Sequence, residues 1–325
     1  FLIKMDLIHN TISFVSTYLL LIFFIIFLRF RNIVKKSDVN IIANLTVNIV
    51  LPALIISKLV FIKLTSEILT ISLVIFLAEI IVFFTSYFFG KYLLKLNNPS
   101  LGVFILCSTV GSTAILGIVF VSAIFEENSY YISKAMIISQ IASGIPANIM
   151  FPIVCGYFGE KTSSNVESLF KTIKKIILSP TIIAVIIGLL WAILHLPTEG
   201  LIITPIIHAA DYIGMSLFLM VALLVGLLID KISIKEYFMP ILICLSLLLI
   251  LEPLLVYYFS TFLNISKQNE QIAFILSGMP ASNAIIAFSI KYKCNAKLAV
   301  VLVLSSVIIG CFSLVFLMYN IPIFK

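Results

Sequence analysis

Long apolar runs, separated by short polar connections, fill almost the whole of this chain. A membrane-spanning helix needs about 20 predominantly apolar residues, and ten runs approach or exceed that length. The predicted spans are 11–28, 41–62, 68–90, 101–122, 131–157, 175–195, 206–229, 237–259, 270–290 and 297–319. The pattern therefore predicts an all-α polytopic membrane protein of ten transmembrane helices, with no soluble domain.

Two of these runs carry residues that interrupt a helix near its middle. In Ser277–Asn283, proline removes a backbone donor and clashes with the preceding turn, and glycine adds backbone freedom. Ser108–Thr113 looks like its counterpart one half-chain earlier. Backbone groups bared within a membrane are tolerated only inside protein or beside a water-filled cavity. Two interrupted helices at corresponding places indicate the binding site of a transporter.

The longest connection, 159–174, divides the chain into two parts, 1–158 and 175–325, with five predicted spans each. Because five is odd, the second part starts from the opposite side of the membrane. Two parts that share a fold must then be inverted repeats, related by a two-fold axis in the membrane plane. An alignment of Ser108–Ile115 with Ser277–Ala284 agrees with this prediction, and it sets the fourth residue of each stretch, Gly111 and Pro280, against one another.

The distribution of basic residues predicts the orientation of the chain. With the N-terminus outside, fifteen of the 21 Lys and Arg residues fall in the connections on the inner side. Such an excess is typical of cytoplasmic loops, so we expect a multi-pass protein of the cell (plasma or inner) membrane, in contact with the lipid bilayer. The same bias accounts for the net charge of +7, which therefore does not indicate nucleic-acid binding.

Other sequence signals argue against an enzyme. The 62% hydrophobic content exceeds what a soluble domain can bury. The five cysteines form no CxxC pair, so no disulfide framework or zinc site is expected. The chain has no HExxH helix motif, no G-x-S-x-G turn and no aspartate-rich cluster. No catalytic residue, metal or resident cofactor is predicted, and the first run, 11–28, is expected to remain as a span because no cleavage site follows it.

Two carboxyl groups lie within apolar runs. Glu79 is at the centre of the third predicted span, and Glu252 precedes Pro253 at the corresponding place in the eighth. A charge at this depth costs on the order of 3 kcal/mol, so each is a candidate site for a coupling cation or a proton. The alternatives are structural: Glu79 would lock helices together, and Glu252 would cap a break at Pro253.

Three further polar side chains lie near the predicted outer ends of spans. His208 and Asp211 are three residues apart and share one face of a helix. We expect them to form an interfacial pair close to water. Lys58, near the end of the second span, is expected to extend its amine to the membrane surface.

Three stretches resemble the auxin efflux carrier family, which includes PIN-type and bacterial membrane transport proteins. Asn44–Ile56 resembles the signature of that family's second span, and Ser179–Leu190 is similar to the P-x-I-x-A-x-x-x-G opening of its sixth. Leu276–Asn283 resembles the Met-Pro segment of its ninth span, and Tyr292 follows in a short loop as in the family. The order and spacing of the stretches extend the resemblance over nearly the whole chain.

The resemblance implies a carrier of two inverted five-helix repeats, shared with bile-acid sodium symporters, in which broken helices 4 and 9 cross at mid-membrane. Helix ends facing the crossing would hold an anionic organic substrate, since a helix N-terminus favours negative charge. The substrate-binding residues that it implies are Pro52, Gly111, Ser112, Thr113, Pro280, Ala281, Ser282 and Asn283. The family's acidic residue in span three and glutamine in span five correspond to Glu79 and Gln140, so the predicted coupling residues are Glu79, Gln140 and Glu252.

The sequence thus predicts a secondary transporter of a small organic anion such as a carboxylate, working by alternating access. Coupling to a proton, to a sodium ion or to neither stays open, and a homodimer is common in such folds. The alternative is a channel or a membrane sensor of the same topology. A channel filter usually needs a ring of like groups from several subunits, which favours the carrier.

Overall fold

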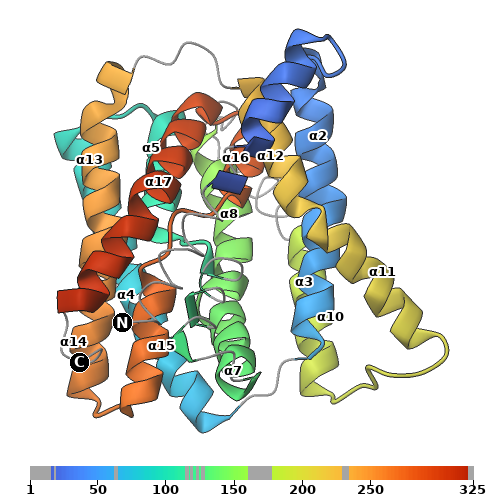
Figure 1. Cartoon of the computed structure of the whole chain (residues 1–325), viewed down its shortest axis with the longest axis vertical. Coiled ribbons are helices and arrows are strands. Elements are labelled where there is room, and N and C mark those ends of the chain that lie inside the picture. The colour runs from blue at the N-terminus through green and yellow to red at the C-terminus, as the bar shows by residue number, and fades with distance from the viewer. Residues whose placement is uncertain are drawn as a thin grey trace, which may run out of the picture.

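The structure is a computed structural model that describes residues 16–17, 20–61, 65–113, 117, 120–121, 124–125, 129–159, 178–228 and 234–320. In this part of the chain one helix follows another along the sequence (Figure 1). The helices in the first predicted part, 1–158, are η1 (Lys36–Asp38), α2 (Val39–Leu45), η2 (Thr46–Val50), α3 (Leu51–Leu59), α4 (Ser66–Phe88), η3 (Phe89–Leu93), α5 (Asn98–Thr109), α7 (Ser129–Ser139), η5 (Gln140–Gly144) and α8 (Ile145–Phe158). Those in the second part, 175–325, are α10 (Pro180–Ile193), α11 (Ile203–Met215), α12 (Leu217–Leu228), η6 (Ile234–Tyr237), α13 (Phe238–Ser246), η7 (Leu247–Leu251), α14 (Glu252–Phe262), α15 (Lys267–Ser277), α16 (Ala284–Lys291) and α17 (Ala296–Asn320).

Among the described residues, six continuous helical stretches are long and apolar enough to cross a membrane. They are Lys36–Leu59, Ser66–Leu93, Tyr130–Phe158, Ile203–Leu228, Phe238–Phe262 and Ala296–Met318. Two shorter apolar helices, Leu20–Phe30 and Pro180–Ile193, lie in the first and sixth predicted spans. The two remaining predicted spans, 101–122 and 270–290, are the interrupted ones. The arrangement of ten spans as two inverted parts stays a prediction, and residues 160–174 of the predicted connection lie outside the described part.

Three of the long helices contain a π-helical turn just before a proline. The turns η2, η5 and η7 each end two residues before Pro52, Pro146 and Pro253, respectively. Proline has no N–H and its ring clashes with the carbonyl four residues earlier, and one extra residue in the turn relieves both problems. At Pro253 the helix therefore bulges and continues into α14, so Glu252 is the first residue of that helix and caps no break.

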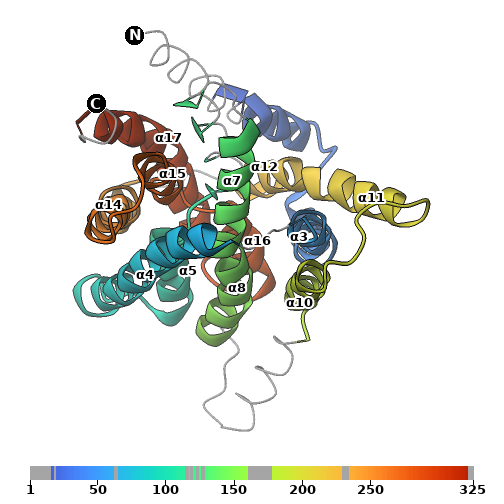
Figure 2. The ribbon, with the colours of Figure 1, turned by 90° about the horizontal axis from the view of Figure 1, so that it is seen from below.

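Helices gather on two sides of the molecule. Figure 2 shows α3, α10 and α11 together on one side and α14, α15 and α17 on the other, with α8 between them. The first side packs closely: a β-carbon on Gly214 of α11 would lie 2.7 Å from the α-carbon of Leu54 in α3. Small residues allow such close approach between membrane helices, where lipid gives no hydrophobic drive to association. On the second side, α4 packs against α5, α14 and α15.

Candidate functional site

The two predicted interruptions are both present, and they meet. Helix α5 ends at Thr109 and α15 ends at Ser277, and the extended residues that follow pair Gly111 with Ala281 in an antiparallel bridge. The Ser112 amide donates to the Pro280 carbonyl at 2.6 Å, and the Ser282 amide donates to the Val110 carbonyl at 2.9 Å. Backbone groups that the helices no longer use thus satisfy one another inside the protein.

The residue types at the crossing fit this geometry. A β-carbon on Gly111 would lie 3.1 Å from the Met279 carbonyl oxygen, so a larger residue would push the two segments apart. The Ala281 amide, which the bridge does not use, donates to the Ser306 hydroxyl of α17 at 3.0 Å. The bridge pairs Gly111 with Ala281, one residue beyond the Pro280 that the sequence alignment sets against it.

A cavity of about 900 Å³ opens beside the crossing. Its wall is formed by the crossing and by residues of α3, α7, η5, α8, α11, α12 and α16. The polar residues that it takes from the crossing and from η5 are Ser112, Thr113, Ser282, Gln140 and Ser143. The remainder of the wall is largely apolar, as in most sites for small molecules.

Charged side chains reach the cavity from α3 and α11. The Lys58 amine forms an ion pair of 2.6 Å with Asp211, and the Ser57 hydroxyl donates to the same carboxylate oxygen at 3.2 Å. His208, one turn before Asp211, also lines the cavity and acts electrostatically on that carboxylate. Lys58 therefore points to Asp211 across the helix interface, where the sequence had predicted an amine extended to the membrane surface.

Glu79 lies behind the cavity wall. Its side chain is 3% exposed, and its Oε1 accepts a hydrogen bond of 2.5 Å from the hydroxyl of Ser143. Ser143 belongs to the π-helical turn η5, three residues after Gln140, and both residues line the cavity. Ser143 thus connects the cavity to a buried carboxyl group.

Glu252 is also deeply buried, with 2% of its surface exposed. Its Oε2 accepts no hydrogen bond from the described residues. It belongs to α14, which packs against α4, the helix of Glu79, and the Glu79 carboxyl group acts electrostatically on it. The two acidic residues that the sequence placed at corresponding positions of two spans therefore lie on helices that contact each other.

The predicted binding residues divide into two groups. Gly111, Ser112, Thr113 and Ser282 line the cavity, as does Gln140 from the predicted coupling set. The others lie elsewhere in the described structure: Pro280 and Ala281 in the crossing behind the wall, Asn283 directly before α16, and Pro52 as the second residue of α3. Sequence reasoning did not identify Ser143 or the pairing of Lys58 with Asp211. The spacing of three residues from Gln140 could have identified Ser143, because it places both on one helix face.

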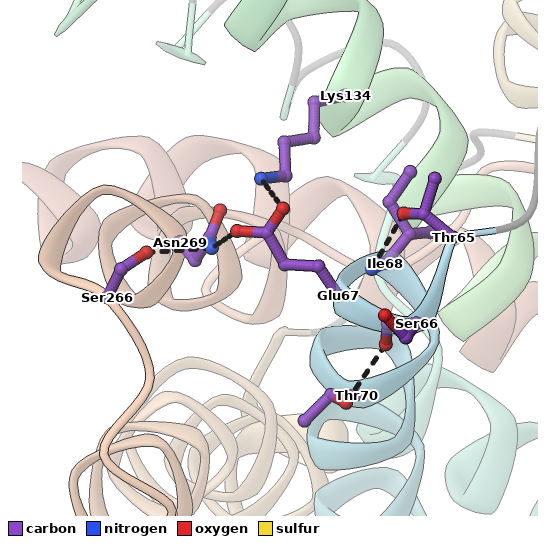
Figure 3. A network of polar contacts seen from close by, with 8 residues as sticks. All are labelled: Thr65, Ser66, Glu67, Ile68, Thr70, Lys134, Ser266 and Asn269. Atoms are coloured by element: carbon purple, nitrogen blue, oxygen red, sulfur yellow. Dashed lines mark hydrogen bonds and ion pairs between the residues drawn. The ribbon is translucent and has the colours of Figure 1, made fainter.

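A polar network joins the start of α4 to two other helices (Figure 3). Glu67 of α4 forms an ion pair of 2.8 Å with Lys134 of α7. It also accepts a hydrogen bond from the side-chain amide of Asn269 in α15. Lys134 is only 7% exposed at its side chain, whereas Glu67 is half exposed. The network connects residues from both predicted repeats.

Within the described residues no group of three or more His, Cys, Asp or Glu side chains is placed to hold a metal ion. Cys107, Cys155, Cys244 and Cys294 are free thiols. The polar groups on the largely apolar wall of the cavity are hydroxyl, amide, amine, imidazole and carboxylate groups.

Comparison with known proteins gives two findings. The chain is similar to an uncharacterized transporter of Methanocaldococcus jannaschii, with 24% identity over 276 residues, which are 84% of this chain and 86% of that protein. The sequence model of a family described as "Membrane transport protein" matches residues 14–318. Since that match covers most of its length, this chain belongs to the membrane transport protein family, as its motifs predicted, and is a multi-pass membrane transporter.

Proposed function

We propose that this protein is a secondary transporter that moves a small organic anion, such as a carboxylate, through the cavity beside the crossing. The observation that carries the proposal is the position of that cavity, which is bounded by two interrupted segments joined at Gly111 and Ala281. Transporters place their substrates at such discontinuous helices, near the interface between two repeats. A cavity of about 900 Å³ has the volume typical of a small-molecule site.

The charge of the cavity supports an anion. Helix α16 begins at Ala284, which lines the cavity, and the N-terminal end of a helix carries a partial positive charge. Lys58 and His208 contribute basic groups to the wall, and the acidic side chain there, among the described residues, is Asp211. An incoming carboxylate would compete with Asp211 for the Lys58 amine.

The same proposal includes the predicted topology of ten spans, with the N-terminus outside the cell membrane. Support comes from the crossing, where one interrupted segment of each predicted repeat meets the other. Each residue in the hydrogen bond from Ser112 to Pro280 has a counterpart 170 positions away in the bond from Ser282 to Val110. Interrupted helices at corresponding places of two halves are expected where inverted repeats meet.

Counterflow in proteoliposomes tests the proposal. Purified protein is first screened for binding of malonate, malate, indole-3-acetate and cholate, which sample dicarboxylates, an aromatic acid and a bile acid. Vesicles are then preloaded with the unlabelled compound that binds, and uptake of its labelled form is measured. A carrier accelerates the uptake, because the loaded site returns faster than the empty one. Equal uptake with and without preloading indicates a pore and contradicts the proposal, as does the absence of binding to all four compounds.

A further inference from the structure

We propose that Glu79 and Glu252 form a single proton-binding site, in which two buried carboxyl groups share one proton. A second part of this inference rests on the proposed function: this site is where a proton couples to anion transport. The proton site can be tested without any substrate, so its failure is distinguishable from failure of the transporter proposal.

The geometry places both groups out of contact with solvent. Glu79 lies at the middle of α4 and Glu252 begins α14, with 3% and 2% of their surfaces exposed. The two helices pack against each other, and the bulge at η7 directly precedes Glu252. A π-helical turn changes the direction in which the following side chains project, and such turns are common at functional sites.

Two negative charges cannot be held side by side in these surroundings. An ionised carboxylate loses its hydration when it is buried, and a second one nearby adds repulsion in a medium of low dielectric constant. Carboxyl groups in this situation keep one proton between them. Among the described residues, Glu79 has one charge-stabilising partner, the Ser143 hydroxyl, and Oε2 of Glu252 has no donor. The pair can therefore accept a proton, but it has too few hydrogen-bond donors to stabilise both carboxyl groups as anions.

Other titratable groups lie on the helices that pack around the pair. They include Cys107 of α5, Tyr130, Tyr131 and Lys134 of α7, Cys244 of α13 beside η7, Tyr257 and Tyr258 of α14, and Lys267 and Glu270 of α15, of which Lys267 is exposed. Lys134 pairs with Glu67, and Glu270 accepts a hydrogen bond from Thr261. The charged group found acting on Glu252, in the described part of the chain, is Glu79. The pair thus has no basic partner there that would neutralise it in place of a proton.

The surroundings favour a proton over a sodium ion. A metal cation exchanges its hydration shell for several oxygen ligands at once, whereas a proton needs one acceptor. The hydroxyl of Ser143 is already turned towards Glu79 as a donor. The buried Ser72 and Ser260 hydroxyls, which also have no described partner, lie seven residues before Glu79 and eight after Glu252, roughly two turns or 10 Å away along their helices. They are too distant to complete the coordination of one ion.

These two serines lie between the carboxyl groups and one end of the molecule. Asn269, near the start of α15, bonds to Glu67 at the start of α4, and the short loop before α15 joins it to the end of α14. Helices α4 and α14 are therefore antiparallel, which puts Ser72 and Ser260 on the same side of the carboxyl pair. A proton would reach the pair between α4 and α14, while an anion occupies the cavity on the other side of Ser143.

Infrared difference spectroscopy of the purified protein, without substrate, tests the site. The C=O stretch of a protonated carboxyl group is followed as pH is varied in wild type, Glu79→Gln, Glu252→Gln and the double variant. Wild type should retain the band to a higher pH than either single variant, because ionising the second group requires two adjacent negative charges. The double variant should lose the band. Glu236→Gln, an exposed carboxyl outside the pair, serves as the matched control and should leave the band unchanged.

Four results would overturn the proposal. The first is the absence of such a band in the wild-type protein, a result that does not depend on any variant folding. The second is a single variant in which the pH of the transition is unchanged, because the two groups would then not interact. The third is a band that survives in the double variant, and the fourth is loss of the band in sodium chloride but not in choline chloride at the same pH, which would make the pair a sodium site.

The coupling role is tested in proteoliposomes that show counterflow. In Glu79→Gln, the ratio of uptake driven by an imposed pH gradient to counterflow at equal pH should fall at least tenfold. If wild-type counterflow is present and the pH gradient has no effect on uptake, the coupling role is wrong and the transporter proposal stands. If counterflow is absent, the transporter proposal fails first.

Discussion

Ser143 donates a hydrogen bond of 2.5 Å from its hydroxyl to Glu79, and the same residue lines the cavity. It is the one described residue that both lines the cavity and bonds to the carboxyl pair. An anion in the cavity and a proton on the pair can therefore influence each other through a single side chain.

Replacing Ser143 with alanine should move the infrared transition of the carboxyl pair to higher pH. The hydroxyl stabilises the ionised form of Glu79, and without it the proton is held more tightly. Ser143→Thr keeps the hydroxyl and should retain the wild-type transition. A transition that is unchanged, or that moves to lower pH in Ser143→Ala, would show that the hydrogen bond does not act on the pair.

Enlarging Gly111 should disrupt the crossing. The β-carbon of valine would lie 3.1 Å from the Met279 carbonyl oxygen, and its two methyl groups would force apart the segments that Ser112 and Ser282 join. We expect Gly111→Val to lower counterflow at least tenfold and Gly111→Ala to have an intermediate effect. Ala209→Val, on an exposed position of α11, adds the same methyl groups as a control. Wild-type counterflow in Gly111→Val would mean that the bridge is not needed for transport.

Substitutions of Lys58 and of Asp211 should change the affinity for the anion in opposite directions. Lys58→Met removes a positive charge from the cavity, and we expect about a tenfold loss of affinity for the anion, or about 1.4 kcal/mol. Asp211→Asn leaves the amine free to bind the anion, so affinity should rise. Lys58→Arg preserves the charge and serves as the control. Isothermal titration measures all three, and equal affinities in Lys58→Met and wild type would remove Lys58 from the binding site.

Thermal unfolding should show how much the protein is destabilised when Lys134 loses its carboxylate partner. Glu67→Gln leaves the buried amine without its carboxylate partner, and an unpaired buried charge is strongly destabilising. The double variant Glu67→Gln/Lys134→Met removes both charges and should unfold at a higher temperature than Glu67→Gln alone. If the double variant is the less stable of the two, then Lys134 is held by other contacts, such as its position over the ring of Tyr130.

The residue types in the sequence predicted where the two helices are interrupted. The backbone preferences of Pro280 and Gly278 in one stretch, and of Gly111 in the other, do not depend on their surroundings. The pairing of Gly111 with Ala281 could not be obtained in the same way, because it depends on how two segments 170 residues apart approach in space. The alignment of the two stretches came within one residue of it.

Side-chain contacts between distant helices were harder to predict. Glu79 and Glu252 stand out because carboxyl groups are rare in apolar runs, yet nothing in the sequence shows that their helices pack against each other. Lys58 and Asp211 each have a plausible explanation at a membrane surface, and only the packing of α3 against α11 brings them together. Ser143 is an ordinary helical serine until the bulge at η5 and the neighbouring α4 place it beside Glu79.

The three π-helical turns that precede prolines have a consequence for relatives of this chain. Each turn contains one residue more than a regular α-helix would, and in a regular helix one residue corresponds to about 100° of rotation. A relative that lost Pro52, Pro146 or Pro253 while keeping its length would present a different set of side chains beyond that point. Substitution of such a proline should therefore be accompanied, in related sequences, by deletion of a single neighbouring residue, and alignments that forbid gaps inside helices would misplace every position that follows.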